Sequence, residues 1–153
     1  MKTLKKILSL VLVAAVLIPS SILLTGCTQG KYTVESMTGG GETTTKAQFM
    51  EKYGDDFDYE NAESIEQAFA ESLAQIFGME INLKSRGVAE ITINLPKWFP
   101  EDKKADIKVN NATWEKKDNQ IIVKEDGEEF LTFKIEDKKL VLEDETLKVV
   151  FSK

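Results

Sequence analysis

The feature that most constrains the fold is the alternation of apolar and polar residues in the second half of the chain. Leu131, Phe133 and Ile135 alternate with polar neighbours, and residues 147–151 repeat the pattern. Because successive side chains of a strand point to opposite faces, each run has one apolar face. Turn signals separate the runs every eight to ten residues, a spacing typical of antiparallel β proteins. These signals are Lys117-Asp118-Asn119, Asp126-Gly127, Asp137-Lys138 and Asp144-Glu145.

The same alternation extends over most of the chain and predicts about nine strands. They cover residues 31–37, 81–83, 89–95, 105–110, 112–116, 120–125, 129–135, 139–143 and 146–152, with a turn at residues 85–87. Nine short strands are enough to close a sheet on itself and so remove its edges. The predicted fold is therefore mainly β, a small antiparallel meander barrel with two short helices inserted after the first strand.

The two helices are predicted within residues 45–78. Residues 45–53 show helical spacing of apolar residues and end before Gly54. A second helix begins near Asn61 or Ser64, with Gln67 placed to complete a capping box, and ends before Gly78. Its expected buried face consists of Ile65, Ala68, Phe69, Leu73, Ile76 and Phe77. The stretch 38–45, with three consecutive glycines, is predicted to be a loop, because glycine loses much entropy on ordering.

The first 27 residues have the pattern of a secretory leader. Three lysines within residues 2–6 precede an uncharged, mostly apolar run over residues 7–24. The run ends in Leu24-Thr25-Gly26-Cys27, which resembles the bacterial lipobox, where the cysteine thiol receives a diacylglyceryl group. We therefore expect a signal peptide at 1–26, a tether at 27–30 with lipidated Cys27, and a barrel domain at 31–153. The alternative is an uncleaved membrane anchor, since 18 residues is near the lower limit for spanning a bilayer.

Composition excludes several classes of activity. The chain has no histidine and one cysteine, which excludes Ser-His-Asp and Cys-His catalysis, zinc fingers and an intrachain disulfide. Residues 27–153 carry 26 acidic and 17 basic side chains, a net charge of −9, which disfavours nucleic acid and anionic lipid headgroups as partners. Most of this charge belongs to residues 27–80, whose net charge is −8. We expect no cofactor, no metal and a monomer.

The order of these motifs resembles the small lipocalin-like (calycin-type) lipoproteins of bacteria. The matching pieces are the lipobox cysteine, the opening GKYTVESM, the helix pair, LKSRGVAEI, ATWEKKDNQIIV and the closing LTFKIEDKKLVLEDETLKVVFSK. Together they span most of residues 27–153. The resemblance implies a barrel-like fold and a location in the cell envelope, and it implies no catalytic residues.

Apolar residues of the strands and one aromatic pair are candidates for a ligand site. The candidate ligand-binding residues are Ile91, Ile93, Trp98, Phe99, Trp114 and Phe133. Four of them could line a cavity inside the barrel, while Trp98 and Phe99, between two prolines, could guard its mouth or form an exposed patch. The alternative is ordinary core packing, because strands this short enclose little volume.

Acidic clusters offer weaker candidates. Asp55, Asp56, Asp58 and Glu60 are spaced like calcium ligands, but Asn61 and Gln67 occupy the places of the glycine and the bidentate glutamate of an EF-hand. A solvated loop is the alternative. Adjacent carboxylates such as Glu128 and Glu129 face opposite sides of a strand, which argues against paired acid and base catalysis.

The sequence thus predicts a non-enzymatic lipoprotein on the extracytoplasmic face of the cell membrane, held there by the lipid on Cys27. It is expected to bind a small apolar ligand or an envelope partner at the barrel opening. The alternative is an assembly or regulatory lipoprotein whose acidic helical section docks a basic protein partner.

Overall fold

The computed structural model describes residues 28–104 and 109–153. The described residues form nine strands, two helices, a one-turn helix and a 3-10 turn. In chain order the elements are β1 (Gly30–Gly39), β2 (Glu42–Thr45), α2 (Lys46–Tyr53), α3 (Ser64–Phe77), β3 (Met79–Leu83), η2 (Ser85–Gly87), β4 (Val88–Ile93), α4 (Glu101–Lys104), β5 (Val109–Lys117), β6 (Gln120–Glu125), β7 (Glu128–Glu136), β8 (Lys139–Glu143) and β9 (Leu147–Ser152).

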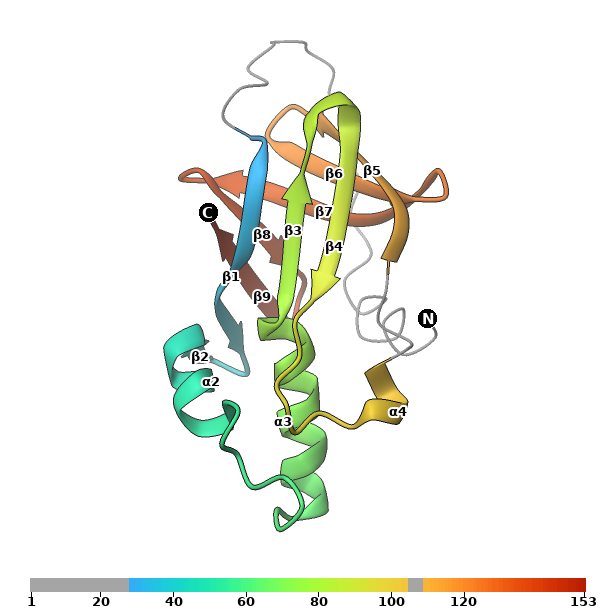
Figure 1. Ribbon diagram of the computed structural model, residues 1–153. Helices are drawn as coiled ribbons and strands as arrows, with labels where there is room; N and C mark the ends of the chain where they lie inside the picture. Colours follow the sequence, from blue (N-terminus) through green and yellow to red (C-terminus); the bar gives the residue numbers. More distant parts are fainter. Residues whose placement is uncertain (1–27, 105–108) are drawn as a thin grey trace.

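Eight of the strands form a closed antiparallel meander barrel. β1 and β3 to β9 pair in order, and the last strand pairs with the first, which closes the sheet (Figure 1). β1 has three neighbours: β9 along one edge, and β3 followed by β2 along the other. This architecture confirms the predicted mainly β meander barrel and is consistent with a lipocalin-like fold.

The turns between strands are tight and follow the predicted signals. Asp126 and Gly127 have φ angles of 52° and 86°, and Asp137 and Lys138 have φ angles of 48° and 66°. Two consecutive residues with positive φ match the twist of an antiparallel hairpin. The predicted turns at Asp126-Gly127 and Asp137-Lys138 are confirmed.

The barrel interior is filled by the apolar face of each strand. Leu131 and Phe133 are buried while Thr132 is exposed, as the alternation predicts. The Phe133 ring packs edge-on against Phe151 of β9, with ring centroids 5.5 Å apart. Each fully buried side chain of this size contributes about 1.5–3 kcal/mol through removal of apolar area from water.

The helices gather at the end of the barrel where β3 begins and β4 ends, which we call the helix end (Figure 1). The opposite end, where β1 begins, is the tether end. Phe49 and Tyr53 of α2, and Leu73 and Phe77 of α3, belong to the same buried cluster as the barrel interior. One continuous core therefore runs from the barrel into the layer between the helices.

Only the second half of α3 contributes to this core. Its buried residues are Ala70, Leu73, Ala74, Gln75 and Phe77. Ile65 and Phe69 are 83% and 54% exposed, and Ala68 is exposed too, so the prediction that these three residues line a buried face is wrong. The start of α3 projects beyond the barrel end, where the described chain offers little surface to cover it (Figure 1).

Several local structures differ from the sequence-based expectation. The glycine-rich stretch predicted to be a loop is a hairpin, in which Gly40 and Gly41 connect β1 to β2 with positive φ angles of 59° and 85°. The predicted strand 105–110 is not separate from 112–116: residues 109–117 form the single strand β5, and residues 105–108 lie outside the described residues.

The capping of the helices also differs from the prediction. A capping box is present on α2, where Thr45 and Gln48 bond reciprocally, and not on α3. The residue before α3 is Glu63, which makes no side-chain cap, and the side-chain amide of Gln67 donates instead to the Tyr59 carbonyl oxygen at 2.8 Å. A long-range partner thus replaces the predicted local one.

Candidate functional site

The predicted pair Trp98 and Phe99 packs against the helices at the helix end. Phe99 is 1% exposed, and the Trp98 indole N–H donates to the carbonyl oxygens of Tyr53 and Gly54 at 3.1 and 2.8 Å. The alternative that this pair forms an exposed patch is therefore wrong. The pair instead fixes the segment after β4 to the end of α2.

The other four predicted ligand residues are spread through the barrel. Ile91, Trp114 and Phe133 are buried in the core cluster, and Ile93 packs against it. The Trp114 indole N–H donates to the Lys84 carbonyl oxygen at 2.8 Å near the tether end. None of the six predicted ligand residues lines the pocket described next.

A pocket of about 240 Å³ lies at the helix end, between α2 and the strands β1 and β3. Its lining residues are Thr33, Lys46, Phe49, Met50, Asp55, Phe77, Gly78, Met79, Glu80, Asn94, Leu95 and Pro96. Thr33 and Glu80 are cross-strand partners in register, and both alternate with buried neighbours, so they face outward. At these two residues the pocket lies against the outer face of β1 and β3, while Phe49, Phe77 and Met79 on its other side belong to the core that continues into the barrel.

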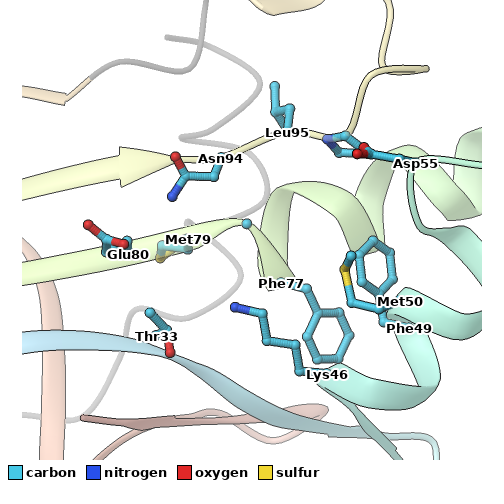
Figure 2. A pocket seen from close by; sticks show the side chains of 12 residues that line it. Thr33, Lys46, Phe49, Met50, Asp55, Phe77, Met79, Glu80, Asn94 and Leu95 are labelled. Carbon is cyan, nitrogen blue, oxygen red and sulfur yellow. The ribbon is translucent and has the colours of Figure 1, made fainter.

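The pocket combines an apolar floor with charged groups at its rim (Figure 2). The floor includes the rings of Phe49 and Phe77, which stack with centroids 4.9 Å apart. Figure 2 shows the Lys46 side chain reaching from α2 across the pocket toward Thr33. Such an arrangement suits a small ligand that has an apolar part and one polar or anionic group.

The two carboxylates at the rim already have cationic partners. Glu80 lies 3.0 Å from Lys31 Nζ, and Asp55 lies 3.5 Å from Lys97 Nζ. The backbone N–H of Lys97 also donates to Asp55 at 3.1 Å, which is the main reason that the pKa of Asp55 is lowered. Within residues 28–104 and 109–153, no carboxylate lies within ion-pairing distance of Lys46.

Close backbone approach shapes the wall of the pocket at Gly78. This residue ends α3 and starts the turn into β3, and its carbonyl oxygen accepts from the Asn94 N–H at 2.8 Å. A Cβ atom at position 78 would lie 2.3 Å from the Asn94 carbonyl oxygen and 2.7 Å from that of Ala74. Only glycine fits here, because it lets α3, β3 and the segment after β4 converge.

A chain of aromatic rings holds the segment after β4 against the helices. Trp98 packs edge-on against Phe57 and stacks on Tyr59, with centroids 5.3 Å apart in each case. Phe57 in turn packs edge-on against Tyr53, 5.0 Å away. Each such pair contributes about 0.5–1.5 kcal/mol beyond area burial. The rings thus fix the positions of two pocket walls relative to each other.

Behind the aromatic rings, Glu71 of α3 joins two other segments. It accepts a short hydrogen bond from the Tyr59 hydroxyl and pairs with Lys103 Nζ of α4 at 2.7 Å. The hydrogen bond to Glu71 is the main cause that raises the pKa of Tyr59 to about 12, followed by desolvation. These contacts attach α4 to α3 and explain why the side chain of Glu71 is only 13% exposed.

Two of the carboxylates in the acidic loop before α3 have partners within the protein, while Asp56 and Glu60 are exposed. Asp55 pairs with Lys97, and Asp58 accepts from the Asn61 side-chain amide at 2.9 and 3.0 Å. Across the described part of the chain, no group of three or more histidine, cysteine or carboxylate side chains is placed to hold a metal ion. The same residues include no helix long and apolar enough to cross a membrane.

Comparisons of the chain with protein-family models, with curated proteins and with solved structures found no match. The candidate site therefore depends on the geometry alone.

Sequence reasoning missed the pocket residues because they come from four separate elements, β1, α2, α3 and β3, and from the segments after α2 and β4. The only local signal was Lys46, a cation in the first turn of a helix, where anionic side chains are favoured. A residue that is unfavourable for its helix is a reason to look for a role outside the helix.

Proposed function

We propose that the chain is a non-enzymatic, lipid-anchored lipoprotein of the extracytoplasmic membrane face that binds a small amphiphilic ligand in the pocket at its helix end. The proposal includes membership of the lipocalin-like lipoproteins that the motif order resembles. The observation that carries the ligand assignment is the pocket with its apolar floor and the Lys46 ammonium group at its rim.

The position of the tether supports a proposal in which the anchor and the ligand pocket lie at opposite ends of the barrel. Thr28 follows the proposed lipidation site, Cys27, and stands two residues before β1, whose start lies at the end of the barrel opposite α2 and α3 (Figure 1). A lipid on Cys27 therefore brings the tether end to the bilayer, while the pocket lies at the far end of the barrel. Two acyl chains hold a protein on a membrane far more firmly than one.

The size and charge of the pocket define the ligand class. A volume of about 240 Å³ is below the usual range of about 300–1,000 Å³ for drug-sized ligands, so the apolar part is short. Lys46 is the rim charge that has no carboxylate partner among the described residues, which favours an anionic head group. A medium-chain fatty acid such as octanoate has both properties.

Calorimetric titration with octanoate and with neutral octanol tests this assignment. We expect octanoate to bind more tightly than octanol, and Lys46→Gln to remove the difference. Lys52→Gln, on the same helix but outside the pocket, is the matched control and leaves binding unchanged. Leu95→Trp fills the pocket and should abolish binding of both ligands. Equal affinities of the unsubstituted protein for octanoate and octanol, or binding that survives Leu95→Trp, would contradict the assignment.

The anchor is tested separately through Cys27. Mass spectrometry of the membrane-bound protein should show cleavage before Cys27 and an added diacylglyceryl group. Cys27→Ala should remain unprocessed and carry no diacylglyceryl group. A Cys27→Ala protein that is still cleaved and still membrane-bound would show that another feature anchors the chain.

The exposed part of α3 favours a second function, docking of a basic protein partner. Ile65 is 83% exposed and Phe69 is 54% exposed, one helical turn apart at the end far from the tether. Glu63 and Glu66 lie beside them on the same helix terminus. Large apolar side chains with an acidic border fit a partner that offers apolar and basic groups.

Partner capture at different salt concentrations, and by variants of α3, tests this second function. A partner captured from envelope extracts at low salt should be lost at high ionic strength, because exposed charges are then screened. The double variant Ile65→Ser, Phe69→Ser should lose the same partner. Val88→Ser, which changes an exposed apolar residue at the tether end, serves as control. Capture that is unchanged by salt would exclude docking driven by charge.

A further inference from the structure

The two ends of the barrel carry opposite charge. Because the sheet is an antiparallel meander, every second connection lies at the same end. The tether end is formed by residues 28–31, 84–87, 116–119, 136–139 and 152–153. These residues include eight lysine or arginine side chains and three carboxylate side chains, a net side-chain charge of +5. Three of the lysines, Lys31, Lys84 and Lys139, pair with Glu80, Glu90 and Glu35 just outside these ranges, which leaves a net charge of +2 when those carboxylates are included.

The helix end has the opposite composition. It is formed by residues 40–78, 94–104, 125–128 and 143–147. These residues include 17 carboxylate and five lysine side chains, a net charge of −12. The net charge of the whole chain hides this division, because it treats the surface as uniform.

The basic side chains of the tether end are accessible to a partner. Arg86, Lys117 and Lys138 are exposed in three different turns. The side chains of Lys31 and Lys84 are 61% and 44% exposed. Positive charge is therefore spread around the rim of this end and is not limited to one strand.

The described part of the chain begins at this same rim. Thr28 is 5% exposed, and its carbonyl oxygen accepts a 2.8 Å hydrogen bond from the Tyr32 hydroxyl. The residue before it is Cys27, so no flexible linker separates a lipid there from Thr28. A lipid on Cys27 would place the basic rim within a few ångströms of the headgroups.

We propose that the basic rim of the tether end docks on anionic phospholipid headgroups and so fixes the barrel upright on the bilayer. This inference rests on the proposed lipid anchor and adds a second contact with the membrane. The two acyl chains of the anchor already supply stable attachment, so the effect of the basic rim is on the orientation of the barrel.

The acidic end does not cancel this attraction. β1 has ten residues, and at a rise of about 3.3 Å per residue it spans roughly 33 Å along the strand. The Debye length is about 10 Å at 0.1 M ionic strength, so charges at the helix end are screened from the bilayer. The membrane therefore interacts with the basic rim of the tether end. The repulsion expected from the net charge of −9 does not apply to this rim.

Vesicle binding of residues 28–153 tests the rim without the anchor. This fragment contains every strand that closes the barrel. Cosedimentation is measured with vesicles of phosphatidylcholine alone and of phosphatidylcholine with phosphatidylglycerol. We expect binding only to the second kind, with loss of binding at high salt. The quadruple variant Lys84→Gln, Arg86→Gln, Lys117→Gln, Lys138→Gln should lower the partition coefficient about tenfold or more.

The matched control removes the same number of charges from the other end. It carries Lys52→Gln, Lys97→Gln, Lys103→Gln and Lys104→Gln, and it should bind anionic vesicles as the unsubstituted fragment does. Circular dichroism checks that both variants fold. Equal loss of binding in the two variants would show that net charge alone matters and would overturn the proposal, as would absence of binding by the folded, unsubstituted fragment.

Lysine acetylation of the full lipidated protein on the same vesicles tests the orientation. Lys84, Lys117 and Lys138 should react more slowly on anionic than on neutral vesicles, and Lys46 should not change. Equal reactivity would contradict the upright orientation. Absence of lipid on Cys27 would instead contradict the anchor, and it leaves the result of the fragment assay unaffected.

Discussion

The hydroxyl group of Tyr32 donates a 2.8 Å hydrogen bond to the carbonyl oxygen of Thr28. Both residues are buried, and the Tyr32 ring belongs to the barrel core. Lys153 Nζ lies 5.3 Å from the centroid of the same ring. One tyrosine on β1 therefore holds the start of the described chain and contacts its last residue.

Tyr32→Phe should lower the free energy of unfolding by about 1–2 kcal/mol, because it leaves the buried Thr28 carbonyl without the hydroxyl donor. Urea denaturation measures the change. Thr43→Ala, which removes an exposed hydroxyl pair with Thr38, is the control and should change stability by less than about 0.5 kcal/mol. Equal effects of the two substitutions would show that the tether contact adds no stability.

Gly78→Ala should destabilise the protein by roughly 2–4 kcal/mol, since a Cβ atom would lie 2.3 Å from the Asn94 carbonyl oxygen. Thermal and urea unfolding measure the loss. Gly39→Ala is the control, because its Cβ atom would make an ordinary 3.5 Å contact with Leu147. A stable Gly78→Ala protein would mean that the ends of β3 and β4 separate easily.

Trp98→Phe should reduce both stability and octanoate binding, because it removes the indole bonds to Tyr53 and Gly54 that connect two pocket walls. We expect a loss of about 1–2 kcal/mol in the free energy of unfolding. Trp114→Phe removes one indole bond near the tether end and should reduce stability but not octanoate affinity. Unchanged octanoate affinity in Trp98→Phe would show that the pocket does not depend on this contact.

The Tyr59 hydroxyl should ionise at a higher pH than that of an ordinary tyrosine, because the hydrogen bond to Glu71 raises its pKa from 10.0 to about 12. Below pH 10, the folded and unfolded chains both hold this proton. Between pH 10 and about 12 only the unfolded chain loses it, so the contribution of this pair to stability falls as the pH rises.

Ultraviolet titration of tyrosinate measures this difference when the Tyr59→Phe spectrum is subtracted. Glu71→Gln should return the pKa of Tyr59 toward 10, since the partner carboxylate is removed. A late titration step that persists in Tyr59→Phe belongs to another tyrosine and would contradict the assignment.

The barrel could be predicted from the sequence because its determinants are local. Alternation such as Leu131, Thr132 and Phe133 fixes which face is buried, and pairs such as Asp126-Gly127 fix the turns. The start of the first helix at Thr45 and the end of the second near Gly78 could also be predicted, since helix caps depend on neighbouring residues.

The failures involve tertiary contacts. The apolar residues Ile65 and Phe69 have helical spacing, but spacing does not show whether another element covers them. Gln67 bonds to Tyr59, eight residues away, and therefore does not cap α3. The pocket escaped prediction for the same reason, because Lys46, Glu80 and Leu95 meet only after the barrel and helices have packed.

The pairing of β1 with β9 has a consequence for the order of folding. Thr33 and Ser152 are partners although 119 positions separate them in the sequence. Contacts this distant in sequence form slowly, because a long loop must close before they contribute. Until β9 pairs with it, β1 has an unpaired edge along residues 33–39, which is a site for aggregation. A folding chain is therefore most in need of a chaperone in the interval before β9 docks against β1.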